Sequence, residues 1–408
     1  MQARRILSLI VIVFAGSFVV VRGIVPAVTV IQTDFPNYYT AGVIARTGSS
    51  AERLYDDAWF QQKMYDQGIS QQGKFSPFPP ATAVLFVPLS LLQPLDALRV
   101  LTALNALFLA GSIVLFSRLF CIPLSESTAL ILLSGWGLVN GFRFGQLYIA
   151  LSFCMLAALY AQRQGLQAAS GVAIGSLLPI KYFSLVLLLD ATLKQRWRTV
   201  FWAMLVSGAI VATSIAVLGW EPHHQWLMSV LGDHLQGNLS QQDPYASTFQ
   251  SLHSLLRRMF VFDAARNPQP LVHSAMLYSL LLYTIILICI VPGVVATVRL
   301  LRRDAATETT LAVLCTLALL LAPATATYHF VLLWLPVGIL LRHYVDNGER
   351  MLTLLTLCVF AAIGFLPYSW FDRFDGRGIV TIAAYPRLLL LAVLYLLSVR
   401  AAHTPRLN

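Results

Sequence analysis

Long runs of apolar residues, separated by short polar loops, recur from one end of this sequence to the other. The first run, from Ile6 to Val30, has about 25 residues, which is enough to cross the hydrocarbon core of a bilayer. Hydrophobic residues make up 58% of the 408 positions and charged residues only 11%, a balance that a water-exposed surface cannot accommodate. Within lipid the backbone must satisfy its own polar groups, which leaves helix bundles or closed barrels, and these runs are too continuous for barrel strands. The sequence therefore predicts an all-α, polytopic transmembrane helical bundle.

The apolar runs predict about 10–12 membrane segments. We expect them to form a single integral-membrane domain over residues 1–408, without an attached soluble domain. The first run follows Arg4 and Arg5 and lacks a small-residue cleavage site, so we expect a retained span rather than a signal peptide. Further segments are expected at about 98–120, 127–139, 147–160, 199–219, 274–298, 308–322, 330–342, 351–366 and 379–399.

Basic residues between the apolar runs predict the orientation, because such charges stay on the cytoplasmic side. A first outer loop at about 31–78, with helices lying on the membrane surface, and a second at about 220–273 then face outside. Because topology explains the basic residues, the net charge of +10 does not predict a nucleic-acid partner. The clusters that place both termini in the cytoplasm are Arg4–Arg5, 194–198, 299–303, 342–350 and 400–406.

Two topologies are possible between the first outer loop and residue 190. If Ala81–Leu92 crosses the membrane, Arg143 is cytoplasmic and Lys181 lies in the middle of the bilayer. If it does not cross, Arg143 lies outside, and the chain breaks at Pro179 into two half-helices with Lys181 at the outer face. The second topology is preferred because a lysine within lipid requires water or a counter-ion.

The first outer loop opens with an acidic residue close to two tyrosines. Asp34, Tyr38 and Tyr39 lie where the first span is expected to leave the bilayer. A carboxylate at the end of a span usually meets water, a partner charge or a substrate. The alternative is that Asp34 caps the helix that starts at Phe35 by accepting backbone N–H bonds. The sequence leaves both interpretations open.

Further polar residues are predicted to share the outer face with Asp34. One carboxylate among cations and aromatic rings suits a lipid-phosphate substrate, because cations stabilise phosphate oxygens and a carboxylate can take a proton from a hydroxyl. Simpler roles stay open: Arg143 as a topology charge, Gln146 as a helix cap, and His329 as an interfacial histidine with a backbone partner. The candidate substrate-binding residues are Tyr38, Tyr39, Arg143, Gln146, Lys181, Tyr328 and His329.

Neither a metal centre nor a cofactor is expected. His223, His224 and His234 fit no recognised ligand spacing, and the outer loops contain no Asp-x-Asp pair. No glycine-rich phosphate loop follows a strand pattern. The five cysteines lie in or beside apolar runs, so they predict buried small side chains rather than disulfides or metal ligands.

Short motifs occur in order along the chain: Asp34-Phe35, Tyr38-Tyr39-x-Ala41-Gly42, Leu54-Tyr55, Phe78-x-Pro80, Gly145-Gln146, Ile180-Lys181 and Tyr328-His329. With these motifs the chain resembles a GT-C superfamily membrane glycosyltransferase, and more narrowly glycosyltransferase family 87, the polyprenol-phosphate-mannose-dependent α-mannosyltransferases. Where family members often carry Lys-Pro, this chain has Lys181-Tyr182, and Tyr328 stands where a second histidine or other polar residue is common.

The resemblance implies a catalytic acid in the first outer loop, with Asp34 as the general base of an inverting transfer. It implies that Lys181 and His329 hold the donor phosphate and that Gln146 lines the cavity. The donor would be a polyprenyl-phosphate-linked sugar, with mannose as the first candidate, and the acceptor a lipid or glycan of the cell envelope. The enzyme would be a multi-pass hexosyltransferase of the bacterial plasma membrane, with its active site facing outside.

Three other functions are compatible with the sequence. A transporter or flippase of a lipid-linked sugar would share the bundle and the lysine but would not need a carboxylate. An O-antigen ligase-like enzyme would use a large outer loop, such as the one that contains Arg257 and Arg258. A non-catalytic scaffold is the weakest alternative, since the polar residues gather on one face.

Overall fold

The described chain is helical throughout, as the sequence predicts. The computed structural model describes residues 2–48, 50–238, 243–303 and 307–404, and within these ranges the only β-pairing is an isolated bridge between Asp263 and Asn267. The chain divides into two compact units, Met1–Asp233 and His234–Asn408, and each is described by itself. The single domain over 1–408 remains a prediction.

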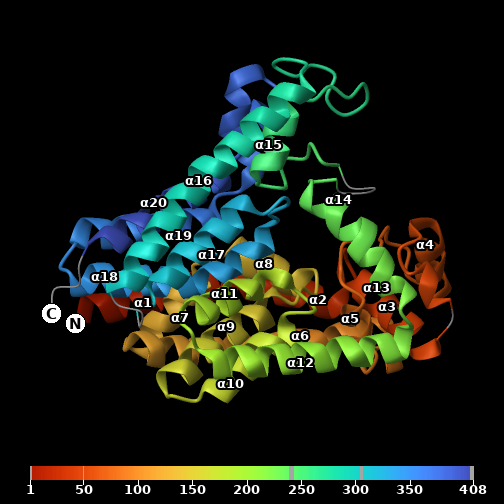
Figure 1. Cartoon of the computed structure of the whole chain (residues 1–408), viewed down its shortest axis with the longest axis horizontal. Coiled ribbons are helices and arrows are strands. Elements are labelled where there is room, and N and C mark those ends of the chain that lie inside the picture. Colours follow the sequence, from red (N-terminus) through yellow and green to blue (C-terminus); the bar gives the residue numbers. More distant parts are fainter. Residues whose placement is uncertain (1, 49, 239–242, 304–306, 405–408) are drawn as a thin grey trace. The chain divides into compact units, whose positions relative to one another are not determined.

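The first unit contains residues 31–78, the expected first outer loop, and the helices around them (Figure 1). Its helices are α1 (Gln2–Val19), η1 (Val20–Ile24), α2 (Val25–Thr29), α3 (Phe35–Thr47), η2 (Ala51–Arg53), α4 (Asp57–Asp66), α5 (Ala81–Leu85), η3 (Leu89–Leu91), α6 (Pro94–Phe120), α7 (Leu124–Leu132), α8 (Trp136–Arg143), α9 (Tyr148–Arg163), α10 (Gln167–Leu177), η4 (Tyr182–Ser184), α11 (Leu185–Leu193), α12 (Trp197–Leu218), α13 (Glu221–Gln225) and η5 (Trp226–Val230). Helix α14 (Leu231–Leu235) spans the division between the two units.

In the second unit, α16, α17, α18, α19 and α20 pack on one another and α15 packs on α16. The bounds are α15 (Leu252–Phe260), α16 (Ala275–Arg303), α17 (Thr309–Leu321), η6 (Thr327–Leu333), α18 (Trp334–Asp346), α19 (Arg350–Phe365), η7 (Tyr368–Trp370), η8 (Asp372–Phe374), η9 (Gly378–Ala384) and α20 (Pro386–His403).

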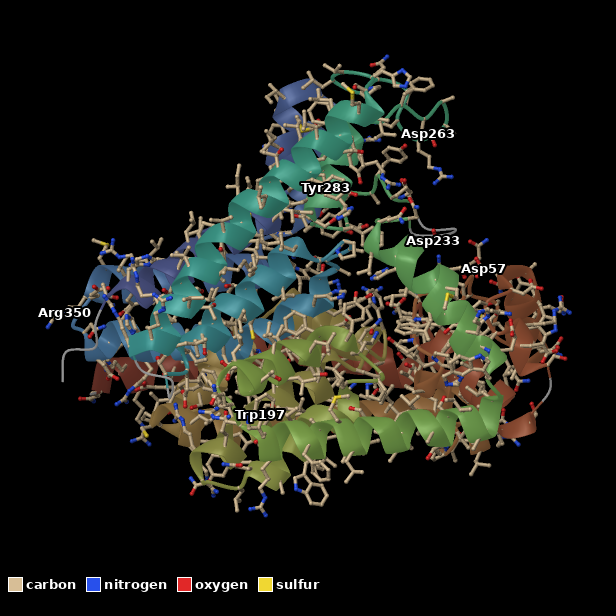
Figure 2. All side chains as sticks on the ribbon, viewed as in Figure 1. Asp57, Trp197, Asp233, Asp263, Tyr283 and Arg350 are labelled. Carbon is tan, nitrogen blue, oxygen red and sulfur yellow. The ribbon has the colours of Figure 1, made fainter. Side chains whose placement is uncertain are left out.

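The described helices include six that are long and apolar enough to cross a membrane. Helices α8 and α9 form a further apolar pair, bent by 117° at the break between them, which makes up to seven candidate spans, and three shorter apolar helices add to the apolar segments of the described residues. Large apolar side chains such as Trp197 on α12 and Tyr283 on α16 are exposed (Figure 2), as expected where lipid is the solvent. This chain is therefore an integral, multi-pass membrane protein.

Helices α10 and α12 come into very close contact because of two glycines. A Cβ added at Gly171 would lie 2.4 Å from the Thr199 carbonyl oxygen, and one at Gly175 would lie 2.4 Å from that of Ala203. Glycines four residues apart allow helix backbones to approach in lipid, where van der Waals packing rather than water exclusion drives association. This contact supports the half-helix that leads to Lys181.

Between residues 79 and 190 the chain has the features of the preferred topology, in which Ala81–Leu92 does not cross the membrane. Ala81–Leu92 forms only α5 and η3, which are too short to cross a bilayer. The predicted break near Pro179 is confirmed, because α10 ends at Leu177 and η4 begins at Tyr182. One expectation is corrected: 127–139 is not one segment but parts of α7 and α8. Gly135 stands between these helices with φ +46°, a backbone conformation that cannot continue an α-helix.

Candidate active site

Asp34 occupies a strained turn at the start of α3. Its backbone has φ 72° and ψ −55°, and the Phe35 N–H donates to the Thr33 carbonyl oxygen at 3.0 Å, which together define a γ-turn of the rare positive-φ form. Such a conformation costs on the order of 1–3 kcal/mol for a non-glycine residue and is often found at functional sites. The Asp34 side chain makes no capping hydrogen bond to α3, so the helix-cap interpretation is wrong.

The Asp34 carboxylate is held by a residue far away in sequence. Gln146 Nε2, in the break between α8 and α9, donates to Asp34 Oδ2 at 2.8 Å. Tyr38 on α3 donates its hydroxyl proton to Gln146 Oε1 at 2.8 Å. Lys181 Nζ donates to the Tyr38 hydroxyl at 3.1 Å. These four residues, Lys181, Tyr38, Gln146 and Asp34, form a continuous chain of hydrogen bonds, which we call the relay.

The Lys181 ammonium lies among three aromatic rings. Nζ is 4.2 Å from the ring centroid of Phe78, 5.0 Å from that of Tyr148 and 5.4 Å from that of Tyr38. Cation–π attraction of about 0.5–2 kcal/mol per ring stabilises the charge at such distances. We call these three rings the aromatic cage. Tyr38 belongs both to the cage and to the relay.

Burial and the neighbouring Asp34 charge shift the pKa values of two relay residues, Lys181 and Tyr38. Lys181 lies in the break between α10 and η4, where burial lowers the pKa of its ammonium to about 7 although the Asp34 carboxylate favours the charged form. Burial, aided by the Asp34 charge, raises the pKa of Tyr38 well above its usual value of 10.0. At neutral pH Tyr38 is therefore a protonated donor, and Lys181 is poised between its charged and neutral forms.

Two predicted substrate-binding residues of this unit have other partners. The buried Tyr39 donates its hydroxyl proton to the Leu92 carbonyl oxygen at 2.8 Å, which ties α3 to the end of η3. Arg143 Nε donates to the Gln32 side-chain oxygen, two residues before Asp34, and the guanidinium carbon lies 5.9 Å from the Phe144 ring centroid. The structure thus brings Asp34, Tyr38, Gln146 and Lys181 together and gives Tyr39 a structural partner.

Tyr328 and His329 belong to the second unit and lie on η6. Their rings stack with centroids 4.9 Å apart, and His329 Nδ1 accepts from the Ala326 N–H at 3.0 Å. His329 therefore has the backbone partner that the simpler interpretation of this residue expects. Roles for these two residues in phosphate binding remain predictions.

Two residues of the site were not identified from the sequence. Tyr148 completes the cage, and buried Asn105 on α6 donates to the main-chain oxygen of Gln146 at 3.1 Å. Tyr148 follows Gln146 by two positions, but its local sequence does not distinguish it from the other aromatic residues of the apolar runs. Asn105 is a polar residue within an apolar span, which is itself a marker of function or packing.

No metal-binding cluster occurs among the described residues, because no three His, Cys, Asp or Glu side chains converge there. His223 bonds through its two ring nitrogens to the Gly219 carbonyl oxygen and the Ser214 hydroxyl, both at 3.0 Å, so it has local structural partners.

Gly145 controls the approach of the α8–α9 break to the Asp34 turn. It has φ +59°, and a Cβ added there would lie 2.8 Å from Phe35 Cβ. We expect Gly145→Ala to lower the melting temperature and the turnover, since it adds a clash of about 1–3 kcal/mol to the positive-φ cost of about 1–2 kcal/mol. Thermal unfolding and turnover are measured against Gly165→Ala, where φ is +73° and nothing lies within 4 Å. Equal losses in both variants would contradict the packing argument.

The fold and the site together define a class of protein. A multi-pass helical bundle that links one carboxylate to one buried, caged lysine has the groups needed to bind a phosphate and to accept a proton. The profile of glycosyltransferase family 87 matches residues 77–323, more than half of the chain. The chain belongs to glycosyltransferase family 87 and is a membrane glycosyltransferase. The matched range includes Gln146 and Lys181 and begins after the Asp34 turn.

Solved structures similar to this chain include two of ArnT from Cupriavidus metallidurans. One, bound to undecaprenyl phosphate, has 12% identity and a TM-score of 0.44 over 97% of this chain and 76% of that chain. The other, in the apo state, has 13% identity and a TM-score of 0.42 with the same coverage. No curated protein sequence matches the chain significantly. The family match favours a glycosyltransferase of family 87 over the transporter, ligase-like and scaffold alternatives.

Proposed function

We propose that this protein transfers a sugar from a polyprenyl-phosphate-linked donor to a lipid or glycan acceptor, with inversion at the anomeric carbon. Mannose is the first candidate for the sugar. Asp34 is the general base and Lys181 holds the donor phosphate. The reaction takes place on the extracytoplasmic face of a bacterial plasma membrane, with both termini in the cytoplasm.

The relay is the observation that carries this proposal. It joins one carboxylate to one cation through two neutral groups, so the two charges stay separate and each keeps a distinct task. The aromatic rings hold the Lys181 ammonium in place but accept few of its hydrogen bonds. The ammonium is therefore suited to donate to a phosphate oxygen. Asp34 is half-buried, so a hydroxyl can reach its carboxylate.

The proposed step balances without a cofactor. The acceptor hydroxyl oxygen forms a bond to the anomeric carbon, and the bond from that carbon to the phosphate oxygen breaks. Asp34 takes the hydroxyl proton, and polyprenyl phosphate leaves with the electron pair. Lys181 stabilises the charge that develops on the phosphate. Because this leaving group needs no proton, a site with one carboxylate is sufficient.

The donor's polyprenyl tail requires an apolar path from the bilayer to the site. In this proposal α5 and η3 form one wall of that path, because these short apolar elements lie beside α3 and next to the cage residue Phe78 in sequence. The donor enters laterally from the outer leaflet.

The test is sugar transfer by the purified full-length protein in lipid nanodiscs. We expect radiolabelled mannose to pass from polyprenyl-phosphate-mannose, but not from a nucleotide-linked mannose, to an acceptor among membrane lipids and glycans. Nuclear magnetic resonance of the product should show an α linkage formed from a β-linked donor. Donors that carry arabinose or a hexosamine test the identity of the sugar.

Two outcomes would contradict the proposal. Transfer from a nucleotide sugar alone would assign a different donor class. Binding of polyprenyl-phosphate sugars with movement across the bilayer and no transfer would favour the transporter.

A further inference from the structure

We infer that Tyr38 and Gln146 are positioning residues, which orient the Asp34 carboxylate and couple it to Lys181 without contacting the sugar. This inference rests on the proposed function, because it concerns the same site. It replaces the substrate-binding roles that the sequence predicts for these two residues.

Gln146 is anchored on three sides, which leaves its side chain committed to protein partners. Its side-chain oxygen accepts from Tyr38, its side-chain nitrogen donates to Asp34, and its main-chain oxygen accepts from Asn105. Gln146 is only 1% exposed and Tyr38 is fully buried. Tyr38 also packs against Phe86, with ring centroids 5.0 Å apart, and against Phe78 at 4.6 Å. Residues held in this way are placed to orient a neighbour rather than to grip a ligand.

The hydrogen bonds of the relay run in one direction. A charged Lys181 can only donate, so the Tyr38 oxygen accepts from it and the single phenol proton goes to Gln146 Oε1. That fixes the Gln146 amide with Nε2 on Asp34, since the opposite orientation would place two oxygens against each other. The cation stands at the donating end and the carboxylate at the accepting end, which is the favourable order.

The two oxygens of the Asp34 carboxylate have different neighbours. Oδ2 accepts from buried Gln146, whereas Oδ1 accepts from the hydroxyl of Thr33, an exposed residue, at 3.4 Å. The γ-turn at Asp34 and the Gln146 bond together restrict how the carboxylate can rotate. An acceptor hydroxyl therefore meets the carboxylate in a fixed orientation.

Because the relay runs from Lys181 to Asp34, donor binding at Lys181 affects the basicity of Asp34. A donor phosphate that draws the Lys181 ammonium away from Tyr38 weakens donation along the relay. A carboxylate that receives a weaker hydrogen bond holds a proton more strongly. Donor binding thus makes Asp34 a stronger base just when a base is needed.

The primary test is Gln146→Met, which keeps the approximate volume and removes both hydrogen bonds of the side chain. We expect kcat to fall about 10- to 100-fold, while the donor KM changes less than about threefold. The acid limb of the kcat profile should move to higher pH, because the carboxylate has lost a donor. In the Asp34→Asn background the same substitution should change the residual kcat less than about threefold, since no carboxylate remains to be positioned.

Tyr38→Phe is the milder second variant, because it keeps the ring among Phe78 and Phe86 and removes only the hydroxyl. It should move kcat and the acid limb in the same directions as Gln146→Met, by smaller amounts. Its matched control is Tyr344→Phe, which removes a buried phenol hydrogen bond of 2.7 Å to the Leu397 carbonyl oxygen. The control should keep the wild-type pH profile. A higher donor KM with an unchanged kcat and pH profile in both relay variants would make them substrate contacts and overturn the inference.

A readout independent of turnover separates this inference from the proposed function. In infrared difference spectra, the carboxylic acid C=O band of Asp34 appears on acidification and is identified by its absence in Asp34→Asn. Its titration midpoint should be higher in Gln146→Met and Tyr38→Phe than in wild type. An unchanged midpoint overturns the relay even if transfer occurs. A shifted midpoint in a protein that transfers nothing from polyprenyl-phosphate sugars supports the relay and contradicts the proposed donor.

Discussion

Asp34→Asn is expected to lower the rate of sugar transfer by about 10²- to 10⁴-fold, the usual contribution of a general base. Asparagine keeps the size of the side chain and tolerates the positive φ of the γ-turn, so the fold should persist. It cannot take the proton of the acceptor hydroxyl. Donor binding should change little, because the phosphate is expected at Lys181. Transfer is measured with polyprenyl-phosphate-mannose, and donor binding is followed in parallel.

A second aspartate within residues 31–78, Asp56, provides the control. Asp56 caps α4 by accepting from the Trp59 N–H at 3.1 Å, which is the role that Asp34 does not have. Asn caps helices about as well as Asp, so Asp56→Asn should keep wild-type turnover. Unchanged turnover in Asp34→Asn would reduce Asp34 to a turn residue and remove the base from the proposed mechanism.

Lys181→Met is expected to raise the donor KM by about 10- to 100-fold, since a hydrogen bond to a charged group contributes about 1.5–3 kcal/mol. Methionine fills the space between the rings but carries no charge for the phosphate. Lys63→Met is the matched control, because the Lys63 ammonium also lies near an aromatic ring, 5.6 Å from the centroid of Trp59, but is paired with Asp66. A wild-type donor KM in Lys181→Met would place the donor phosphate elsewhere.

The pKa of Lys181 leads us to expect that kcat/KM depends on pH. Burial lowers the pKa of Lys181 to about 7, so its positive charge is lost as the pH rises through that value. The ratio kcat/KM reports the free enzyme and should therefore fall with increasing pH above about 7. Lys181→Arg stays charged throughout this range and should lack that basic limb. A basic limb that persists in Lys181→Arg would assign it to another group.

Much of the secondary structure follows from local sequence. Segments such as Pro94–Phe120 and Trp197–Leu218 lie close to the expected 98–120 and 199–219, because hydropathy is a property of each segment alone. The break near Pro179 was also predictable, since proline removes a backbone donor and clashes with the preceding turn. The interruption between α7 and α8 was not, because one glycine in an apolar run does not reveal its φ.

The site was predictable only in part. Asp34 stands out as an acid at the end of a span, and Lys181 as a cation between apolar half-helices, so each is conspicuous by itself. Tyr148 is one aromatic residue among many in apolar runs, and nothing local separates a cage ring from a lipid-facing ring. Tyr39 lies next to Tyr38 in the same motif, yet its hydroxyl bonds to a backbone oxygen.

Hydropathy alone identifies this chain as a multi-pass helical membrane protein and picks out the polar residues that lie in or beside its apolar segments. Both follow from the free energy of transferring each segment from water to lipid, to which distant residues contribute little. The partners of these polar residues depend on how the helices pack: Gln146 reaches Asp34 across 112 positions and Lys181 reaches Tyr38 across 143. A hydrogen bond requires its two atoms to come within about 3 Å, and for residues so far apart only the packing of the intervening helices sets that distance.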